Sequence, residues 1–219
     1  MRRRRRSLHL SGWLLCGLCA FTRGDAPTGL PYSQNFEKTV EGEVPADVLV
    51  LSGNFTVKKV DGNTVLELSP DVLDNDGILA GPADQSTYAV SAKIQATSTG
   101  KRAPEFGIAA NGPGQFRLWL MPAVKQLQLL KADDIKATAP YDWTSGSWTR
   151  FKLEVAKGTV GKFTIRGKAW PDGKGEPKDW MVSTEDAEAP QVGRAGFYAT
   201  PYSGTPVRFD DLTVEAVKD

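Results

Sequence analysis

Aromatic and polar side chains alternate with apolar ones in the run Phe116–Met121, whose sequence is FRLWLM. In a strand, successive side chains point to opposite faces, so Arg117 and Trp119 share one face while Phe116 and Leu118 share the other. A sugar presents apolar ring faces rimmed by hydroxyls, and an aromatic plate flanked by hydrogen-bonding groups suits that surface. Trp119 is therefore a candidate ligand plate, and the alternative is a tryptophan covered by a loop.

The same alternation assigns other polar side chains to outward faces of neighbouring runs. Gln128 lies in the run that follows Trp119, and Tyr198 alternates with the apolar Phe197. Lys93 and Arg166 occupy outward positions in runs elsewhere in the chain. We expect one ligand-binding set, which comprises Trp119, Arg117, Gln128, Lys93, Arg166 and Tyr198.

The histidine and cysteine residues, which often serve in covalent or metal-based catalysis, all lie near the N-terminus. The chain has one histidine, His9, and two cysteines, Cys16 and Cys19. Without them the rest of the chain cannot form a Ser-His-Asp or Cys-His arrangement or a zinc site of the usual ligand types. The acidic run Glu185–Glu188 is typical of a solvated turn. No catalytic residue is predicted, and an enzyme is the less favoured alternative.

The N-terminal segment has the features of a secretory signal peptide. Five arginines, residues 2–6, precede an apolar run from Leu8 to Phe21, which at roughly 14 residues is short of the about 20 needed to span a bilayer. Cleavage after Ala20 or Gly24 suits the small-residue rule, and an uncleaved anchor is the alternative. We expect a signal peptide at 1–24, a short tail at 25–30, and a secreted or periplasmic protein with no membrane insertion after signal removal.

Removal of that segment changes the charge of the chain. Lys plus Arg falls from 27 to 21 against 26 Asp plus Glu, so the formal net charge moves from +1 to −5. A mildly acidic exported domain is poorly suited to bind nucleic acid. The composition therefore predicts no nucleic-acid partner.

Period-two alternation continues through most of the chain after Pro31. Short turn signals such as Asp61-Gly62, Lys157-Gly158 and Ser203-Gly204 separate the runs, and no sustained apolar stripe has helical spacing. Many short strands with turns between them are typical of an all-β sandwich. We expect one two-sheet antiparallel jelly-roll domain over residues 31–217.

A long hairpin is predicted around the segment AWPDGKGEPKDW, residues 169–180. Its first strand carries Phe163 and Ile165, and Pro171-Asp172-Gly173 should end that strand. A short strand is expected to begin at Trp180. Cross-strand pairing of Trp170 with Trp180 is favoured over a sugar-binding role for these two rings.

Several motifs in this order resemble the concanavalin A-like lectin/glucanase superfamily. Within it, the chain is similar to the laminin G-like jelly-roll domains of secreted bacterial proteins, some of which occur beside quinoprotein-like propellers or glycosidase modules. The motifs that carry the resemblance are Phe36-Glu37, the runs Trp148–Val155, Lys162–Trp170 and Glu176–Trp180, Gly193–Phe197 and Phe209–Val214.

The resemblance implies a two-sheet jelly roll, often with a concave face that meets carbohydrate. Glucanases of the superfamily carry a Glu-x-Asp-x-Glu run, which this sequence lacks. Several such jelly rolls hold a structural calcium between the first and last strands, and Glu37 and Asp210 occupy the matching positions here. No other cofactor is implied.

These observations favour an exported, non-catalytic domain that binds carbohydrate or a cell-surface glycan. Two alternatives remain open. One is a glycoside hydrolase-like enzyme acting on a polysaccharide or disaccharide. The other is a structural domain that docks on a partner protein.

Overall fold

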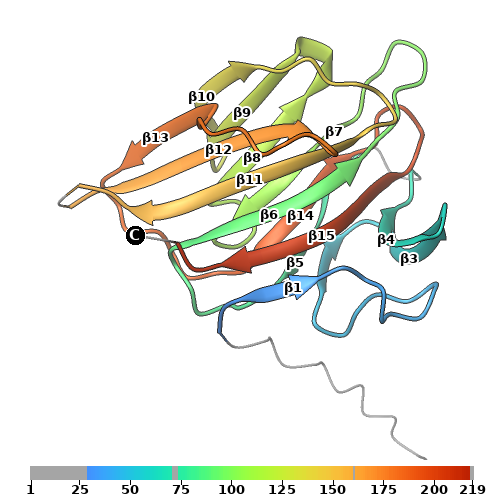
Figure 1. Ribbon diagram of the computed structural model, residues 1–219, viewed down its shortest axis with the longest axis horizontal. Helices are drawn as coiled ribbons and strands as arrows, with labels where there is room; N and C mark the ends of the chain where they lie inside the picture. The colour runs from blue at the N-terminus through green and yellow to red at the C-terminus, as the bar shows by residue number, and fades with distance from the viewer. Residues whose placement is uncertain (1–28, 71–73, 160, 218–219) are drawn as a thin grey trace, which may run out of the picture.

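The computed structural model describes residues 29–70, 74–159 and 161–217. The predicted signal segment, with His9, Cys16 and Cys19, lies outside these residues. Within them the chain forms two antiparallel sheets stacked face to face (Figure 1). The predicted all-β sandwich is confirmed.

Sheet A contains eight strands of the described residues, and strands distant in sequence lie side by side in it. Its central strand β15 (Val207–Glu215) pairs on one side with β6 (Tyr88–Gln95). On its other side, β15 pairs with β4 along one half and with β1 along the other. The remaining strands of sheet A are β1 (Tyr32–Gln34), β3 (Phe55–Val60), β4 (Asn63–Leu68), β11 (Trp148–Lys157), β12 (Phe163–Pro171) and β13 (Val182–Asp186), in the order β13-β12-β11-β6-β15-β4-β3.

Sheet B contains seven strands of the described residues, in the order β10-β9-β8-β7-β14-β5-β2. A single 3-10 turn, η1 (Pro122–Val124), joins β8 to β9. No helix in the described part of the chain has the length and apolar character needed to cross a membrane. The strands are β2 (Leu49–Ser52), β5 (Asp76–Ala80), β7 (Glu105–Ala110), β8 (Phe116–Met121), β9 (Gln126–Lys131), β10 (Asp134–Pro140) and β14 (Ala195–Thr200).

The core lies between the two sheets and is built from the inward half of each alternation. Phe106 of β7 meets Phe151 of β11 with ring centroids 5.9 Å apart, and Phe197 of β14 meets Phe209 of β15 at 4.8 Å. All four rings are fully buried. Each such side chain contributes about 1.5–3 kcal/mol by leaving water. This shared interior fixes which side chains are left on the two outer faces.

The loop between β12 and β13, residues 172–181, crosses the outer face of sheet A (Figure 1) and is called the strap here. The Trp180 ring lies over Arg166 and Lys168, each 4.6 Å from its centroid. The Lys168 ammonium is almost fully buried and donates to the carbonyl of Pro177 at 2.6 Å. The strap is thus held by cations on β12.

Two details predicted for this hairpin are wrong. The second strand begins at Val182, and Trp180 belongs to the strap. Trp180 packs against two cations, and the ring pairs of the described residues do not include Trp170 with Trp180. The physical reason is that a long strap lets Trp180 fold back over β12, where cation–π contact is available.

Candidate functional site

Four of the six predicted binding residues lie together on the outer face of sheet B. In the register, Gln128 of β9 pairs with Trp119 of β8, and Trp119 pairs with Gly107 of β7. Gly107 in turn pairs with Tyr198 of β14. Arg117 is two residues from Trp119 on the same face. We call this surface, defined by Arg117, Trp119, Gln128 and Tyr198, the platform.

Two glycines under the platform permit close approaches, of the Tyr198 ring at Gly77 and of the neighbouring backbone at Gly107. A Cβ at Gly77 would lie 2.5 Å from the Tyr198 ring, and a Cβ at Gly107 would overlap the carbonyl oxygen of Leu118. Trp119 and Tyr198 are each only 7% exposed and form, with Ala109, a cluster separate from the core. Most of the Trp119 ring is therefore covered, although it faces away from the core.

A hollow of about 210 Å³ opens beside Trp119, and we call it the sheet B hollow. Tyr202 supplies a second ring at its edge and is 37% exposed. The hollow thus combines an accessible aromatic side chain with acidic, basic, amide and hydroxyl groups. Its described lining residues are Asn75, Glu105, Arg117, Trp119, Leu130, Thr200 and Tyr202.

The polar groups of the hollow are held in place by neighbours. The indole Nε1 of Trp119 donates to Oε2 of Glu105 at 3.5 Å. Burial raises the pKa of Glu105, and the hydrogen bond from Trp119 opposes that rise. A terminal nitrogen of Arg117 donates to the carbonyl of Ala132 at 2.7 Å and to Asp133 at 2.9 Å. The hollow therefore presents a fixed carboxyl acceptor and a fixed guanidinium.

Hydrogen bonding is incomplete on the platform. The hydroxyl of Tyr198 and the Nε of Arg117 are buried and have no hydrogen-bond partner among the described residues. Unmatched buried polar groups cost free energy, and they are rare enough in folded proteins that each requires an explanation. The platform has two of the five such atoms among the described residues, and the other three belong to Asp76, Asn111 and Trp143.

Lys93 and Arg166 are not part of the platform. They lie on β6 and β12 of sheet A, whose outer face is on the opposite side of the sandwich. The Lys93 ammonium is 3.1 Å from both Asp210 and Asp211, and Arg166 is 2.7 Å from Glu154. Burial acts to lower the pKa of Lys93, but the carboxylates of Asp210 and Asp211 outweigh burial and raise that pKa. The expectation of one surface containing all six residues is wrong, because parity along a strand does not reveal which sheet the strand joins.

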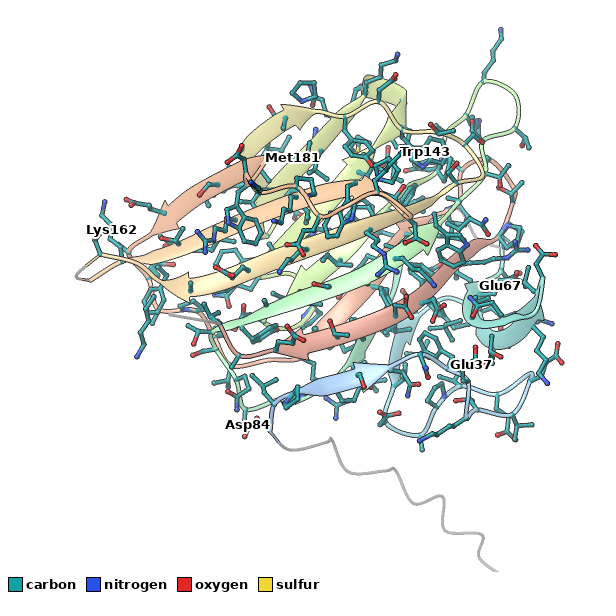
Figure 2. The ribbon with its side chains drawn as sticks, viewed as in Figure 1. Glu37, Glu67, Asp84, Trp143, Lys162 and Met181 are labelled. Carbon is teal, nitrogen blue, oxygen red and sulfur yellow. The ribbon has the colours of Figure 1, made fainter. Side chains whose placement is uncertain are left out.

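Glu37 and Asp210 do not fit a calcium site. The Asp210 carboxylate accepts from Asn63 at 2.8 Å and from Lys93, whose ammonium already supplies a cation. Glu37, in the loop after β1 (Figure 2), accepts from the hydroxyl of Thr64 at 2.9 Å. Calcium takes six to eight oxygen ligands. Among the described residues no three His, Cys, Asp or Glu side chains gather where they could hold a metal.

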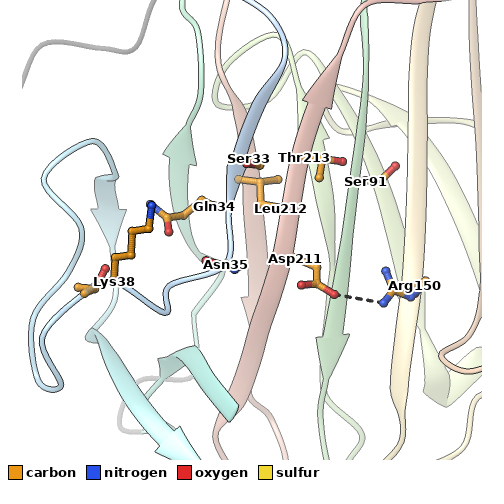
Figure 3. Close-up of a pocket in the computed structure, with 10 residues that line it drawn as sticks. Ser33, Gln34, Asn35, Lys38, Ser91, Arg150, Asp211, Leu212 and Thr213 are labelled. Carbon is orange, nitrogen blue, oxygen red and sulfur yellow. Dashed lines mark hydrogen bonds and ion pairs between the residues drawn. The ribbon is translucent and has the colours of Figure 1, made fainter.

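A larger depression lies on the outer face of sheet A, between β1 and β11 (Figure 3), and we call it the sheet A cleft. Its volume is about 580 Å³. An ion pair of 3.1 Å joins Arg150 of β11 to Asp211 of β15 at one wall, and the loop carrying Lys38 forms the other. The described lining residues are Ser33, Gln34, Asn35, Lys38, Thr39, Ser91, Arg150, Asp211, Leu212 and Thr213.

Sequence reasoning did not single out Glu105 or Tyr202 in the sheet B hollow. Glu105 directly precedes the inward Phe106, so alternation could have placed it on the outer face with Trp119. Tyr202 follows the end of β14, where alternation gives no information. The sheet A cleft was also missed, since it depends on the pairing of β1 with β15.

The chain matches no known family model and no curated protein sequence. Solved structures do resemble it. The carbohydrate binding module CBM66 from Bacillus subtilis has a TM-score of 0.54 at 13% identity, over 78% of this chain and 96% of that one. The lumenal domain of VIP36, in a Ca²⁺/Man2-bound form, has a TM-score of 0.54 at 9% identity, over 85% and 88%. An alginate lyase, Aly36B, in complex with alginate trisaccharide, has a TM-score of 0.51 at 11% identity, over 86% and 98%.

These likenesses establish the fold. The two stacked antiparallel sheets, with the strand orders given above, are a jelly-roll sandwich of the concanavalin A-like class. At such low identity the likeness extends to the backbone arrangement and not to individual site residues.

Proposed function

We propose that this protein is an exported, non-catalytic domain that binds carbohydrate through the platform and the sheet B hollow. The observation that carries the proposal is the juxtaposition of Trp119 and Tyr202 with Glu105 and Arg117 in one depression. Aromatic side chains meet the apolar faces of sugar rings, and charged groups form strong hydrogen bonds to their hydroxyls. The natural ligand in this proposal is a cell-surface or extracellular glycan.

The dimensions of the hollow restrict how a glycan binds there. At about 210 Å³ it accommodates one ring or a chain end. Tyr202 is the accessible aromatic side chain, whereas Trp119 is largely buried and contributes its hydrogen bond to Glu105. Tyr202 therefore makes the stacking contact, and Trp119 positions the carboxyl group of Glu105.

The hollow suits binding better than hydrolysis. Glycoside hydrolases generally use two carboxyl groups that flank the scissile bond. Glu105 is the one acidic residue among the described residues that line the hollow. The similar structures support carbohydrate as the ligand class, since they include a carbohydrate binding module and a lumenal domain in a Ca²⁺/Man2-bound form.

The proposal includes export of the domain. Residues 1–24 act as the signal peptide, and residues 31–217 form the jelly roll, of the laminin G-like kind found in secreted bacterial proteins. Docking on a partner protein is the rival role. A glycan array that stays silent, together with a protein partner that is retained specifically, would establish the rival.

A glycan array with the purified protein and two Tyr202 variants tests the proposal. Tyr202→Ala should weaken binding by about 1–3 kcal/mol, the scale of a lost aromatic anchor. Tyr202→Phe keeps the ring and should bind nearly as well as the unaltered protein. Equal binding by the alanine variant would show that the sheet B hollow is not the site.

A further inference from the structure

The sheet A cleft contains a row of hydroxyl groups that crosses three strands. Ser33 of β1 pairs with Thr213 of β15, and Thr213 pairs with Ser91 of β6. Adjacent strands are about 4.8 Å apart, so these three outward side chains are regularly spaced (Figure 3). Within the described part of the chain, none of the three side chains makes a hydrogen bond, and each can both donate and accept.

The charged groups around this row are held in ion pairs, with three carboxylates for two cations. Lys93 pairs with Asp210 and Asp211, and Arg150 pairs with Asp172 and Asp211. These groups leave no excess cation to attract an anion to the floor of the cleft. Of the charged side chains among the described lining residues, only Lys38 lacks an ion pair, and it belongs to the wall loop (Figure 3).

The lining of the cleft is also mainly polar. Leu212 is the one aliphatic side chain among the described lining residues, and it is fully buried in the core. A ligand that relies on apolar contact would find little area here. A ligand that presents many neutral donors and acceptors matches the free hydroxyls and the exposed Asn35.

We propose that the sheet A cleft is a second binding site, which takes a neutral, hydroxyl-rich glycan segment. The volume of about 580 Å³ falls within the usual range of ligand pockets, and it exceeds that of the sheet B hollow. The cleft therefore holds more of a glycan chain than the hollow does. Ser33, Ser91 and Thr213 bind ligand hydroxyls, while Arg150 and Asp211 supply a charged donor and acceptor at the wall.

The two sites have a joint consequence for binding. They lie on opposite outer faces of the sandwich, so a short oligosaccharide cannot occupy both. One protein molecule can instead bind two glycan chains, or two segments of a long one. Two such sites strengthen retention on a polysaccharide surface without any new contact. This inference extends the proposed carbohydrate-binding role, but its residues are separate from those of the platform.

Amide-resolved NMR titration of the purified protein tests both sites separately. The probes are glucose, galactose, mannose, xylose and their common disaccharides, each at high millimolar concentration, with glucuronate as an anionic control. At least one neutral sugar should shift the amide signals of Ser33, Ser91 and Thr213. Signals of Glu105 and Tyr202 report the sheet B hollow in the same spectra.

A double variant, Ser91→Ala with Thr213→Val, removes two hydroxyl groups. Alanine keeps the small size of Ser91, and valine keeps the β-branched shape of Thr213. Loss of two hydrogen bonds should weaken sugar binding at the cleft by about tenfold or more. Shifts at Glu105 and Tyr202 should persist, which also shows that the variant is folded.

Each outcome decides between the sites. If no neutral sugar shifts the cleft amides, or if the double variant titrates there like the unaltered protein, the second site is refuted. Shifts confined to the cleft would uphold it and contradict the platform proposal. Tighter binding of glucuronate than of glucose, abolished by Lys38→Ala, would refute the neutral ligand class.

Discussion

The two outer faces of this sandwich are built from the same alternation but have opposite chemistry. The face of sheet B is aromatic, because Trp119 and Tyr198 lie on the two strands that pair with β7 on either side of Gly107. The face of sheet A is ionic, with Lys93 and Arg150 held by acids of β15 and of the strap. The difference shows that an outward position is defined only by its neighbours on adjacent strands.

Small residues cause much of this difference. On sheet B, Gly77 leaves space for the Tyr198 ring to lie against the backbone, and Gly107 leaves space for the neighbouring backbone at Leu118. On sheet A, outward positions of β11 and β12 carry long charged side chains, which need partners because they are partly buried. The first face therefore depends on packing, and the second depends on charge pairing.

The largest effect is expected where packing on sheet B is tightest. Gly107→Ala places a methyl group against the backbone of Leu118, so the free energy of unfolding should fall by about 3 kcal/mol. Chemical denaturation measures this. Ser91→Ala, on the open face of sheet A, serves as the control and should change stability by less than about 0.5 kcal/mol. Similar values for the two variants would contradict the contrast between the faces.

The next effect concerns the strap on sheet A. Glu176 lies 2.8 Å from the buried ammonium of Lys168 and 3.0 Å from that of Lys152. Glu176→Gln removes a partner of Lys168 and should destabilise the protein by about 1 kcal/mol, since Glu176 is itself partly exposed. The matched control is Glu185→Gln, whose partner Lys162 is at the surface, and it should cost less than about 0.5 kcal/mol. Equal losses in the free energy of unfolding for the two variants would show that burial of Lys168 does not strengthen its ion pair with Glu176.

A smaller, pH-dependent effect follows from the same carboxylate. Partial burial would raise the pKa of Glu176, but hydrogen bonds from Lys168 and Lys152 outweigh it and lower that pKa below its ordinary 4.5. Because the pKa of Glu176 is lower in the folded state than in the unfolded state, its ionised carboxylate stabilises the protein at pH values above the unfolded-state pKa. That stabilisation is lost as the pH falls through the folded-state pKa. The difference in the free energy of unfolding between the unaltered protein and Glu176→Gln should be constant above pH 4.5. Below pH 4.5 this difference should shrink towards zero. A difference that persists in acid would contradict this assignment.

The smallest effect is expected from removal of calcium. Lys93 already neutralises Asp210, and Glu37 is bonded to Thr64. Addition of a chelator such as EGTA should therefore leave the thermal unfolding midpoint unchanged. A clear drop in that midpoint, reversed by calcium, would show that the carboxylates of this region bind metal after all.

The sequence predicted the fold and the outward positions well, because both follow from local alternation. Trp119 and Lys93 were both correctly assigned away from the core. Their separation onto opposite faces could not be predicted, since it depends on β6 pairing with β15 and β8 pairing with β7. Trp180 was misplaced for a similar reason: the contacts of a long loop are set by whatever surface it meets.

A crystal structure of the protein with the sugar that binds most tightly on the glycan array tests most directly whether the sheet B hollow binds carbohydrate. We expect a sugar ring stacked on Tyr202, with a hydroxyl bonded to Glu105 beside Trp119. A glycan bound only elsewhere on the protein, with the hollow empty, would contradict this expectation.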